Sequence, residues 1–147
     1  MTAELEIRNA TEALRSAVNA GDIAGILACW APDGVLLPPH HPLVRGHAAI
    51  AAFFADVFAA RHLTFTFTDS VITAGEDLAI ERLTFTARVT ALRDGTTTED
   101  VGKGVHVYAR QRSGGWKLVQ DIWNSDRPLP APDVRSSGSA LATPDKR

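Results

Sequence analysis

The hydrophobic period of this sequence changes once along the chain, and that change restricts the fold more than any other feature. Before His62, apolar residues recur at helical spacing, as in Ile7, Ala10, Leu14, Ala17 and Val18. From His62 onward, apolar and polar residues alternate, as in Thr64-Phe65-Thr66-Phe67-Thr68. The first pattern indicates amphipathic helices and the second indicates half-buried strands. Helices followed by a strand meander predict an α+β fold, with the helices on one face of an antiparallel sheet.

The first 60 residues are predicted to form three helices and one short strand. The first helix ends at Gly21, and Asp22 caps a second helix over Ile23–Cys29. We expect a turn at Trp30–Gly34 and a strand at Val35–Leu37. A third helix is expected from about Gly46 to Phe58, and it should be largely buried because apolar residues cover most of its circumference: Ile50, Phe53, Phe54, Val57 and Phe58.

Four long strands are predicted near 63–73, 77–91, 99–112 and 115–126. Turn residues separate them at Gly75-Glu76-Asp77, Asp94-Gly95 and Ser113-Gly114-Gly115. Two further glycines, Gly102 and Gly104, lie inside a strand pattern, where we expect a bulge and a sharp bend.

Composition places the chain among ordinary globular proteins and excludes several function classes. Of 147 residues, 45% are hydrophobic and 22% are charged, with a formal net charge of −2 and no cluster of Lys or Arg, so nucleic-acid binding is not expected. No apolar run approaches the roughly 20 residues that a membrane span needs. A lone cysteine, Cys29, and the absence of a signal peptide predict a cytoplasmic protein. We expect one domain over residues 1–127 and a disordered Pro- and Ser-rich tail over 128–147.

Three local patterns carry a resemblance to a known superfamily. They are Asn19-Ala20-Gly21-Asp22 with Trp30-Ala31-Pro32-Asp33-Gly34, then Arg45-Gly46-His47-Ala48-Ala49-Ile50, then Gly115-Trp116-Lys117-Leu118 with Asp121-Ile122-Trp123-Asn124-Ser125-Asp126. Together with the element order, they resemble the nuclear transport factor two-like superfamily, and within it the SnoaL-like and SgcJ/EcaC-type branch. The resemblance covers roughly residues 4–127.

That resemblance implies a conical half-barrel, in which a curved antiparallel sheet wraps around the N-terminal helices and encloses an apolar pocket. Superfamily members include ketosteroid isomerases, scytalone dehydratase, limonene epoxide hydrolase and SnoaL-type polyketide cyclases, which all use acid–base chemistry. The isomerases use a carboxylate base, a tyrosine and a protonated acid, and the shared turns put Leu37, Leu14 and His106 at these positions. None of the three groups is retained, so the chain resembles the isomerases in shape and is not expected to share their mechanism.

The candidate catalytic pair comes from the last two strands. A two-residue loop at Ser113-Gly114 pairs His106 with Asp121 and Gly104 with Trp123. Alternation then puts His106, Tyr108, Asp121 and Trp123 on one face together with Val119, and the resemblance turns that face toward the pocket. A His with a carboxylate neighbour in an apolar cavity can act as a general acid–base pair. A structural cross-strand pair on a semi-exposed face is the alternative.

The opposite face of these strands is more apolar, which leaves the orientation of the sheet open. If the faces are exchanged, the polar groups of the pocket become Asn124, Gln120 and Lys103. Other candidate ligand-binding residues are Trp30, Phe54, Phe58, Tyr108, Trp123, Asn124, Glu81 and His41. For Trp30, Phe54 and Phe58 a place in the core is the alternative, and for Glu81 it is a surface salt bridge.

Nothing in the sequence predicts a metal or a cofactor. His40 and His41 are adjacent in a proline-bracketed loop without a third ligand, so we interpret the loop as the rim of the pocket. Two functions remain open: an acid–base enzyme of the isomerase, cyclase or dehydratase type that acts on an apolar, ring-containing metabolite, and a non-catalytic ligand-binding or dimerisation domain. Strands with apolar residues on both faces predict a homodimer through the sheet.

Overall fold

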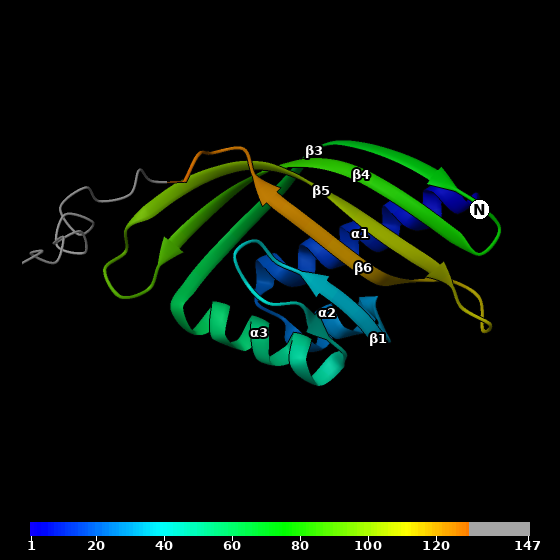
Figure 1. Ribbon diagram of the computed structural model, residues 1–147, viewed down its shortest axis with the longest axis horizontal. Coiled ribbons are helices and arrows are strands. Elements are labelled where there is room, and N and C mark those ends of the chain that lie inside the picture. The colour runs from blue at the N-terminus through cyan, green and yellow to red at the C-terminus, as the bar shows by residue number, and fades with distance from the viewer. Residues whose placement is uncertain (130–147) are drawn as a thin grey trace, which may run out of the picture.

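The computed structural model describes residues 1–129, which form three helices and one six-stranded sheet (Figure 1). In chain order the elements are α1 (Ala3–Ala20), α2 (Ile23–Cys29), β1 (Trp30–Leu37), β2 (Val44–Arg45), α3 (His47–Ala60), β3 (Arg61–Ala74), β4 (Leu78–Ala91), β5 (Thr97–Arg110) and β6 (Trp116–Ser125). The strand order is β2-β1-β6-β5-β4-β3, and the sheet is curved and open. The predicted α+β half-barrel is confirmed.

Local capping fixes where the first two helices begin and end. The Thr2 side chain accepts a hydrogen bond from the Leu5 amide at the start of α1. Gly21 ends α1 in the left-handed conformation, with φ of 66°. Asp22 then accepts a hydrogen bond from the Gly25 amide and caps α2, as the sequence predicts.

The sheet is mixed, which corrects the expectation of a wholly antiparallel one. The long strands β3 to β6 form an antiparallel meander, but β1 pairs with β6 in parallel. The segment Trp30–Gly34, predicted as a turn, belongs to β1, because Trp30 pairs with Leu118 before the register shifts and resumes at Val35. An irregular strand of this kind keeps turn-forming residues such as Pro32 and Gly34 in its middle.

One face of the long strands is buried against α1 and the other is exposed. On β4, buried residues alternate with exposed ones from Ala79 to Ala87. In Figure 1, α1 runs along the concave side of the sheet. Most buried positions on this inner face are apolar, but Glu81 and His106 are buried there too, with 1% and 3% of their surface exposed.

The glycines of β5 have a different role from the predicted one. The β4–β5 pairing is continuous through Gly102 and Gly104, so there is no bulge at these residues. A Cβ atom on Gly102 would lie 2.5 Å from the Phe85 ring and 2.3 Å from the Asn124 carbonyl oxygen. On Gly104 it would lie 3.1 Å from the Trp123 Cβ atom. The missing side chains therefore let Phe85 and Trp123 lie close over β5.

Helix α3 is less buried than predicted. Only Ile50 and Phe54 are buried, whereas Phe53, Val57 and Phe58 are half-buried. One side of α3 faces an open pocket, which leaves Phe53 and Val57 partly uncovered. Within residues 1–129, no helix has the length and apolar character needed to cross a membrane. The predicted tail, 128–147, lies almost entirely outside the described residues.

Candidate active site

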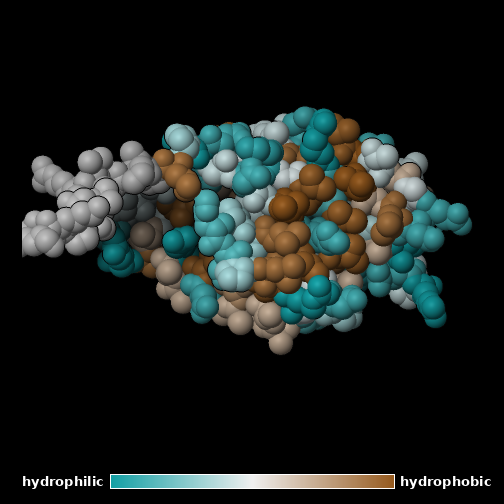
Figure 2. Space-filling view, viewed as in Figure 1, coloured by the Kyte–Doolittle hydropathy of each residue, from teal (hydrophilic) through white to brown (hydrophobic). Residues whose placement is uncertain are grey.

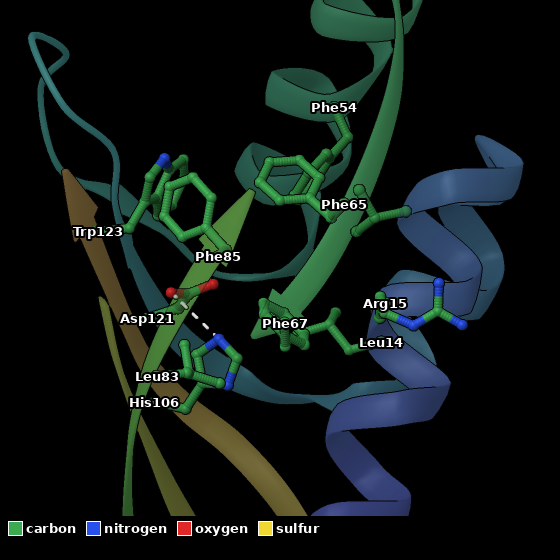
Figure 3. Close-up of a pocket in the computed structure, with 11 residues that line it drawn as sticks. Leu14, Arg15, Phe54, Phe65, Phe67, Leu83, Phe85, His106, Asp121 and Trp123 are labelled. Atoms are coloured by element: carbon green, nitrogen blue, oxygen red, sulfur yellow. Dashed lines mark ion pairs between the residues drawn. The ribbon is translucent and has the colours of Figure 1, made fainter. Parts of the chain in front are cut away.

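Two adjoining pockets lie between the helices and the inner face of the sheet. The inner one has a volume of about 80 Å³ and is lined by Leu14, Arg15, Val18, Phe54, Phe65, Phe67, Leu83, Phe85, His106, Asp121 and Trp123 (Figure 3). The outer one, of about 630 Å³, opens beside α3 and the loop after β1. Four aromatic residues, which we call the aromatic collar, line both pockets: Phe54, Phe65, Phe85 and Trp123. The collar separates a small, mostly apolar inner chamber from a wider outer one.

The β5–β6 hairpin brings His106 and Asp121 together. The register pairs His106 with Asp121 and Gly104 with Trp123, as predicted. His106 Nε2 lies 3.5 Å from Asp121 Oδ1, and both side chains line the inner chamber (Figure 3). The face that carries them is thus the concave one, and the alternative orientation of the sheet is wrong.

The hairpin reaches this register by a different route from the predicted one. The loop has five residues, 111–115, and a register shift lies between Val107 and Tyr108. Because of this bulge, Leu118 rather than Val119 lies opposite Tyr108. Leu118 is completely buried and Val119 is half-buried, which corrects the prediction that Val119 shares the inner face.

A second carboxylate approaches His106 from its other side. Glu81 lies opposite His106 in the β4–β5 register, and its Oε2 atom is 3.4 Å from His106 Nδ1. This contact lacks the direction of a good hydrogen bond. The imidazole is therefore flanked by Glu81 on β4 and Asp121 on β6, in a polar row across the inner face of the sheet.

Hydroxyl groups surround Glu81. Ser70 on β3 donates a hydrogen bond of 2.6 Å to Oε1, and Thr11 on α1 donates one to Oε2. Thr11 Oγ1 is also 2.8 Å from the Tyr108 hydroxyl. Since the single Thr11 proton goes to Glu81, Tyr108 must donate to Thr11. The hydrogen bonds therefore run in one direction, from Tyr108 through Thr11 to the carboxylate.

These surroundings affect the two carboxyl groups oppositely. Burial alone would raise the pKa of Glu81, but the nearby His106 and the hydrogen bonds from Ser70 and Thr11 bring it below its ordinary value of 4.5. For Asp121, burial raises the pKa above 3.8, against the lowering effect of His106. Burial opposes the charged form of His106, yet Asp121 and Glu81 together raise its pKa above 6.5.

The predicted ligand-binding residues divide into two groups. Phe54 and Trp123 line both pockets, and His41 lines the outer one, where its ring meets Phe53 edge-on. The remaining predicted residues line neither pocket: Trp30, Phe58, Tyr108, Asn124 and Glu81.

Their positions explain why. Trp30 and Tyr108 are buried in the core, and Phe58 packs beside the core, stacked on Phe54. Asn124 is exposed because its register position puts it on the convex face, like Gln120 and Lys103. Glu81 is buried behind His106, so a surface salt bridge at this position is wrong.

Sequence reasoning missed Thr11, Ser70 and two of the four collar residues, Phe65 and Phe85. The alternation in Thr64–Thr68 indicates that Phe65 and Phe67 share a face, but which face needs the fold. Thr11 lies among apolar helical positions of α1, a signal that could have marked it as buried. Within residues 1–129, no group of three or more His, Cys, Asp or Glu side chains is arranged to hold a metal ion.

Comparison with known proteins places this arrangement in a family. The model of the SnoaL-like domain matches residues 11–119. No functionally curated protein matches the chain. A ketosteroid isomerase-like protein from Erwinia carotovora atroseptica is similar in structure, with a TM-score of 0.77 and 22% identity over 87% of this chain and 100% of that one.

Two further structures are similar. A provisionally named aromatic ring hydroxylase from Novosphingobium aromaticivorans has a TM-score of 0.78 and 27% identity, over 86% of this chain and 90% of that one. An NTF2-like superfamily protein from Salmonella enterica serovar Typhimurium has a TM-score of 0.77 and 16% identity, over 88% and 94%. These likenesses agree with the cone-like fold.

Proposed function

Because the chain belongs to the SnoaL-like family of the NTF2-like superfamily, we propose that it is an acid–base enzyme of the isomerase, cyclase or dehydratase type. The observation that carries this proposal is the His106–Asp121 pair, 3.5 Å apart on the wall of an apolar chamber. Two titratable groups in such a place have the geometry and the shifted pKa values that proton transfer needs.

The two groups are suited to different steps. Asp121 has 15% of its side chain exposed and a pKa raised by burial, so its carboxylate is a stronger base than a solvated one. The His106 imidazole can return a proton or donate a hydrogen bond to an oxygen that gains charge. Proton abstraction next to a carbonyl, followed by reprotonation or loss of a leaving group, requires only these two functions.

The pocket sizes favour a ligand in two parts. An apolar cavity of about 150 Å³ is large enough to hold a benzene molecule, and the inner chamber has about 80 Å³. A small reactive end therefore suits the inner chamber, and an apolar ring system suits the collar and the outer pocket of about 630 Å³. Aromatic walls favour flat rings, since stacked or edge-to-face contacts add to burial.

We also propose that the protein is a homodimer through the convex face of the sheet. Several large apolar side chains are exposed there: Val71, Leu78, Ile80 and Ile122, each with 45% or more of its surface uncovered. Val105 and Val107 lie beside them in the strand register. Figure 2 shows apolar side chains gathered over the region where β4, β5 and β6 cross in Figure 1. A contiguous apolar area on a sheet favours burial by a second copy.

The proposed function can be tested before any natural substrate is known. The protein is incubated in D₂O with a panel of one-ring, two-ring and three-ring ketones, and exchange of the C–H protons next to the carbonyl is followed by NMR. We expect exchange above the buffer rate for at least one compound that binds. Asp121→Asn and His106→Gln should lower its rate by about two to four orders of magnitude.

The control for these variants is Asp77→Asn, an exposed turn carboxylate outside both pockets, which should leave the rate unchanged. Compounds that bind in the pocket without any enhanced exchange would contradict the enzymatic function. That result would favour the alternative, a non-catalytic ligand-binding domain.

A further inference from the structure

The polar row across the inner face of the sheet contains one carboxylate, Glu81, that a ligand in the two pockets cannot touch. Glu81 lines neither pocket and has 1% of its surface exposed. Arg82, its neighbour in sequence, is exposed and belongs to the convex face, so it offers no compensating charge. An isolated carboxylate in such a place would be very unfavourable. Ser70 and Thr11 donate hydrogen bonds to it, and His106 is the neighbouring group that can carry a compensating positive charge.

The hydrogen bonds around Glu81 favour its ionised form. Ser70 donates to one oxygen, and Thr11 donates to the other. His106 Nδ1 lies 3.4 Å from that second oxygen. An ionised carboxylate accepts from both hydroxyl groups and faces His106 without presenting a proton to any of the three groups. Tyr108 donates to Thr11 and so directs the Thr11 proton toward Glu81.

Asp121 has no comparable set of donors among the described residues. Within residues 1–129, its one polar side-chain contact is with His106, at 3.5 Å. Two carboxylates that share one imidazole thus have unequal support, since Glu81 is held ionised by hydroxyl donors and Asp121 faces an apolar chamber. Such inequality gives the two carboxylates separate roles, with Glu81 as a fixed negative charge and Asp121 as the group that can take up a proton.

We propose that Glu81 is a positioning residue that holds His106 as an imidazolium, so that His106 acts as the acid and Asp121 as the base. The assignment of acid and base rests on the proposed function, whereas the charge state of His106 does not. Nδ1 faces Glu81 at 3.4 Å and Nε2 faces Asp121 at 3.5 Å, so the Nε2 proton is the one available to the ligand. The imidazole is therefore a donor in the resting protein.

Among the described residues, the rings packed against His106 on β3 and β5 are uncharged. On β3, the Phe67 ring meets the imidazole edge-on at 6.0 Å, and on β5 the Tyr108 ring does the same. Burial raises the pKa of Tyr108, which therefore stays a neutral donor. Arg15 of α1 is the cation that also lines the chamber, but it pairs with Glu12 and points away from His106 in Figure 3.

The test is an NMR titration of the histidines, which needs no substrate. His106 is identified among the five histidines by comparison with His106→Gln. We expect Glu81→Gln, which keeps the shape but replaces one of the two accepting oxygens with an NH2 donor, to lower the pKa of His106 by about one to three units. Glu81→Asp keeps the charge and should retain part of the shift. Glu76→Gln, an exposed turn residue before the same strand, should have no effect.

A folded Glu81→Gln protein with an unchanged His106 pKa would overturn the proposal. If the variant does not fold, the nitrogen-15 spectrum of the wild-type ring decides. Two protonated ring nitrogens at pH 7 support the proposal, and one unprotonated nitrogen overturns it. A neutral His106 would overturn the role of Glu81 without affecting the result of the exchange assay. A His106 imidazolium in a protein without exchange activity would support the role of Glu81 and contradict the enzymatic function.

Discussion

Glu81 and His106 lie directly opposite one another on neighbouring strands, and both side chains are almost completely shielded from solvent. Their contact links the inner chamber to a network that reaches α1 through Thr11 and β3 through Ser70. The helix, three strands and the candidate site are thus connected by one set of polar contacts. Changes in this network should affect stability as well as activity.

The first prediction concerns the pH dependence of stability. Glu81 has a pKa below 4.5 when folded, so its contribution is complete above pH 4.5 and is lost as the pH falls through the folded pKa. His106 has a pKa above 6.5 when folded, so its contribution is complete below pH 6.5 and is lost as the pH rises through the folded pKa. The pair therefore contributes most between pH 4.5 and 6.5.

In that window, Glu81→Gln should lower the free energy of unfolding by about 2 kcal/mol, the typical contribution of hydrogen bonds to charged groups. The difference in unfolding free energy between wild type and Glu81→Gln should become smaller at pH values below and above this window. Urea titrations at a series of pH values measure it. A difference that does not change with pH would mean that the lost stability comes from packing rather than from charge.

Sequence patterns identified one half of this site and missed the other half. The predicted tight turn is a five-residue loop, and the bulge between Val107 and Tyr108 restores the predicted register, which is why His106 and Asp121 were paired correctly. The pairing of Glu81 with His106 depends on the β4–β5 loop, whose centre lies between Arg93 and Asp94, one residue before the predicted turn. A single-residue error of this kind changes the partner of every side chain along a strand.

The second prediction concerns the glycines under the aromatic collar. A Cβ atom on Gly102 would meet both the Phe85 ring and a backbone carbonyl of β6 at less than 3.0 Å. Because the backbone atom cannot move without shifting the strand, Gly102→Ala should cost about 1–3 kcal/mol of stability. Lys103→Ala, next in sequence but exposed on the convex face, removes a surface ion pair with Asp126 and should cost less than about 1 kcal/mol. Equal losses of unfolding free energy in the two variants, measured in urea, would show that the packing of Phe85 does not depend on the missing side chain at Gly102.

Other features of the fold could not be predicted because they depend on distant pairing. The parallel contact of β1 with β6 joins residues about 90 positions apart, such as Trp30 and Leu118, and no local pattern specifies it. By contrast, the helix boundary at Gly21-Asp22 follows from local capping and was predicted correctly. The prediction that α3 is largely buried is wrong because several of its apolar side chains line an open pocket instead of the core.

The third prediction concerns assembly. Ile122→Lys introduces a charge into the exposed apolar area on the convex face, next to Val105, where it would be buried against a second copy. We expect analytical ultracentrifugation at micromolar concentration to give a dimer for wild type and a monomer for the variant. Thr86→Lys, on the same face but among threonines and charged residues, should remain dimeric. A wild-type monomer would contradict the proposed interface.

The most direct test of the acid–base account is the pH profile of the exchange rate, measured with a ketone that wild type turns over. If ionised Asp121 is the base and protonated His106 the acid, the profile is bell-shaped. Its rising limb lies above pH 3.8, the ordinary pKa of an aspartate, and its falling limb lies above pH 6.5. The rising limb should disappear in Asp121→Asn, and the falling limb should move to lower pH in Glu81→Gln. A profile that keeps both limbs unchanged in these variants would contradict the account.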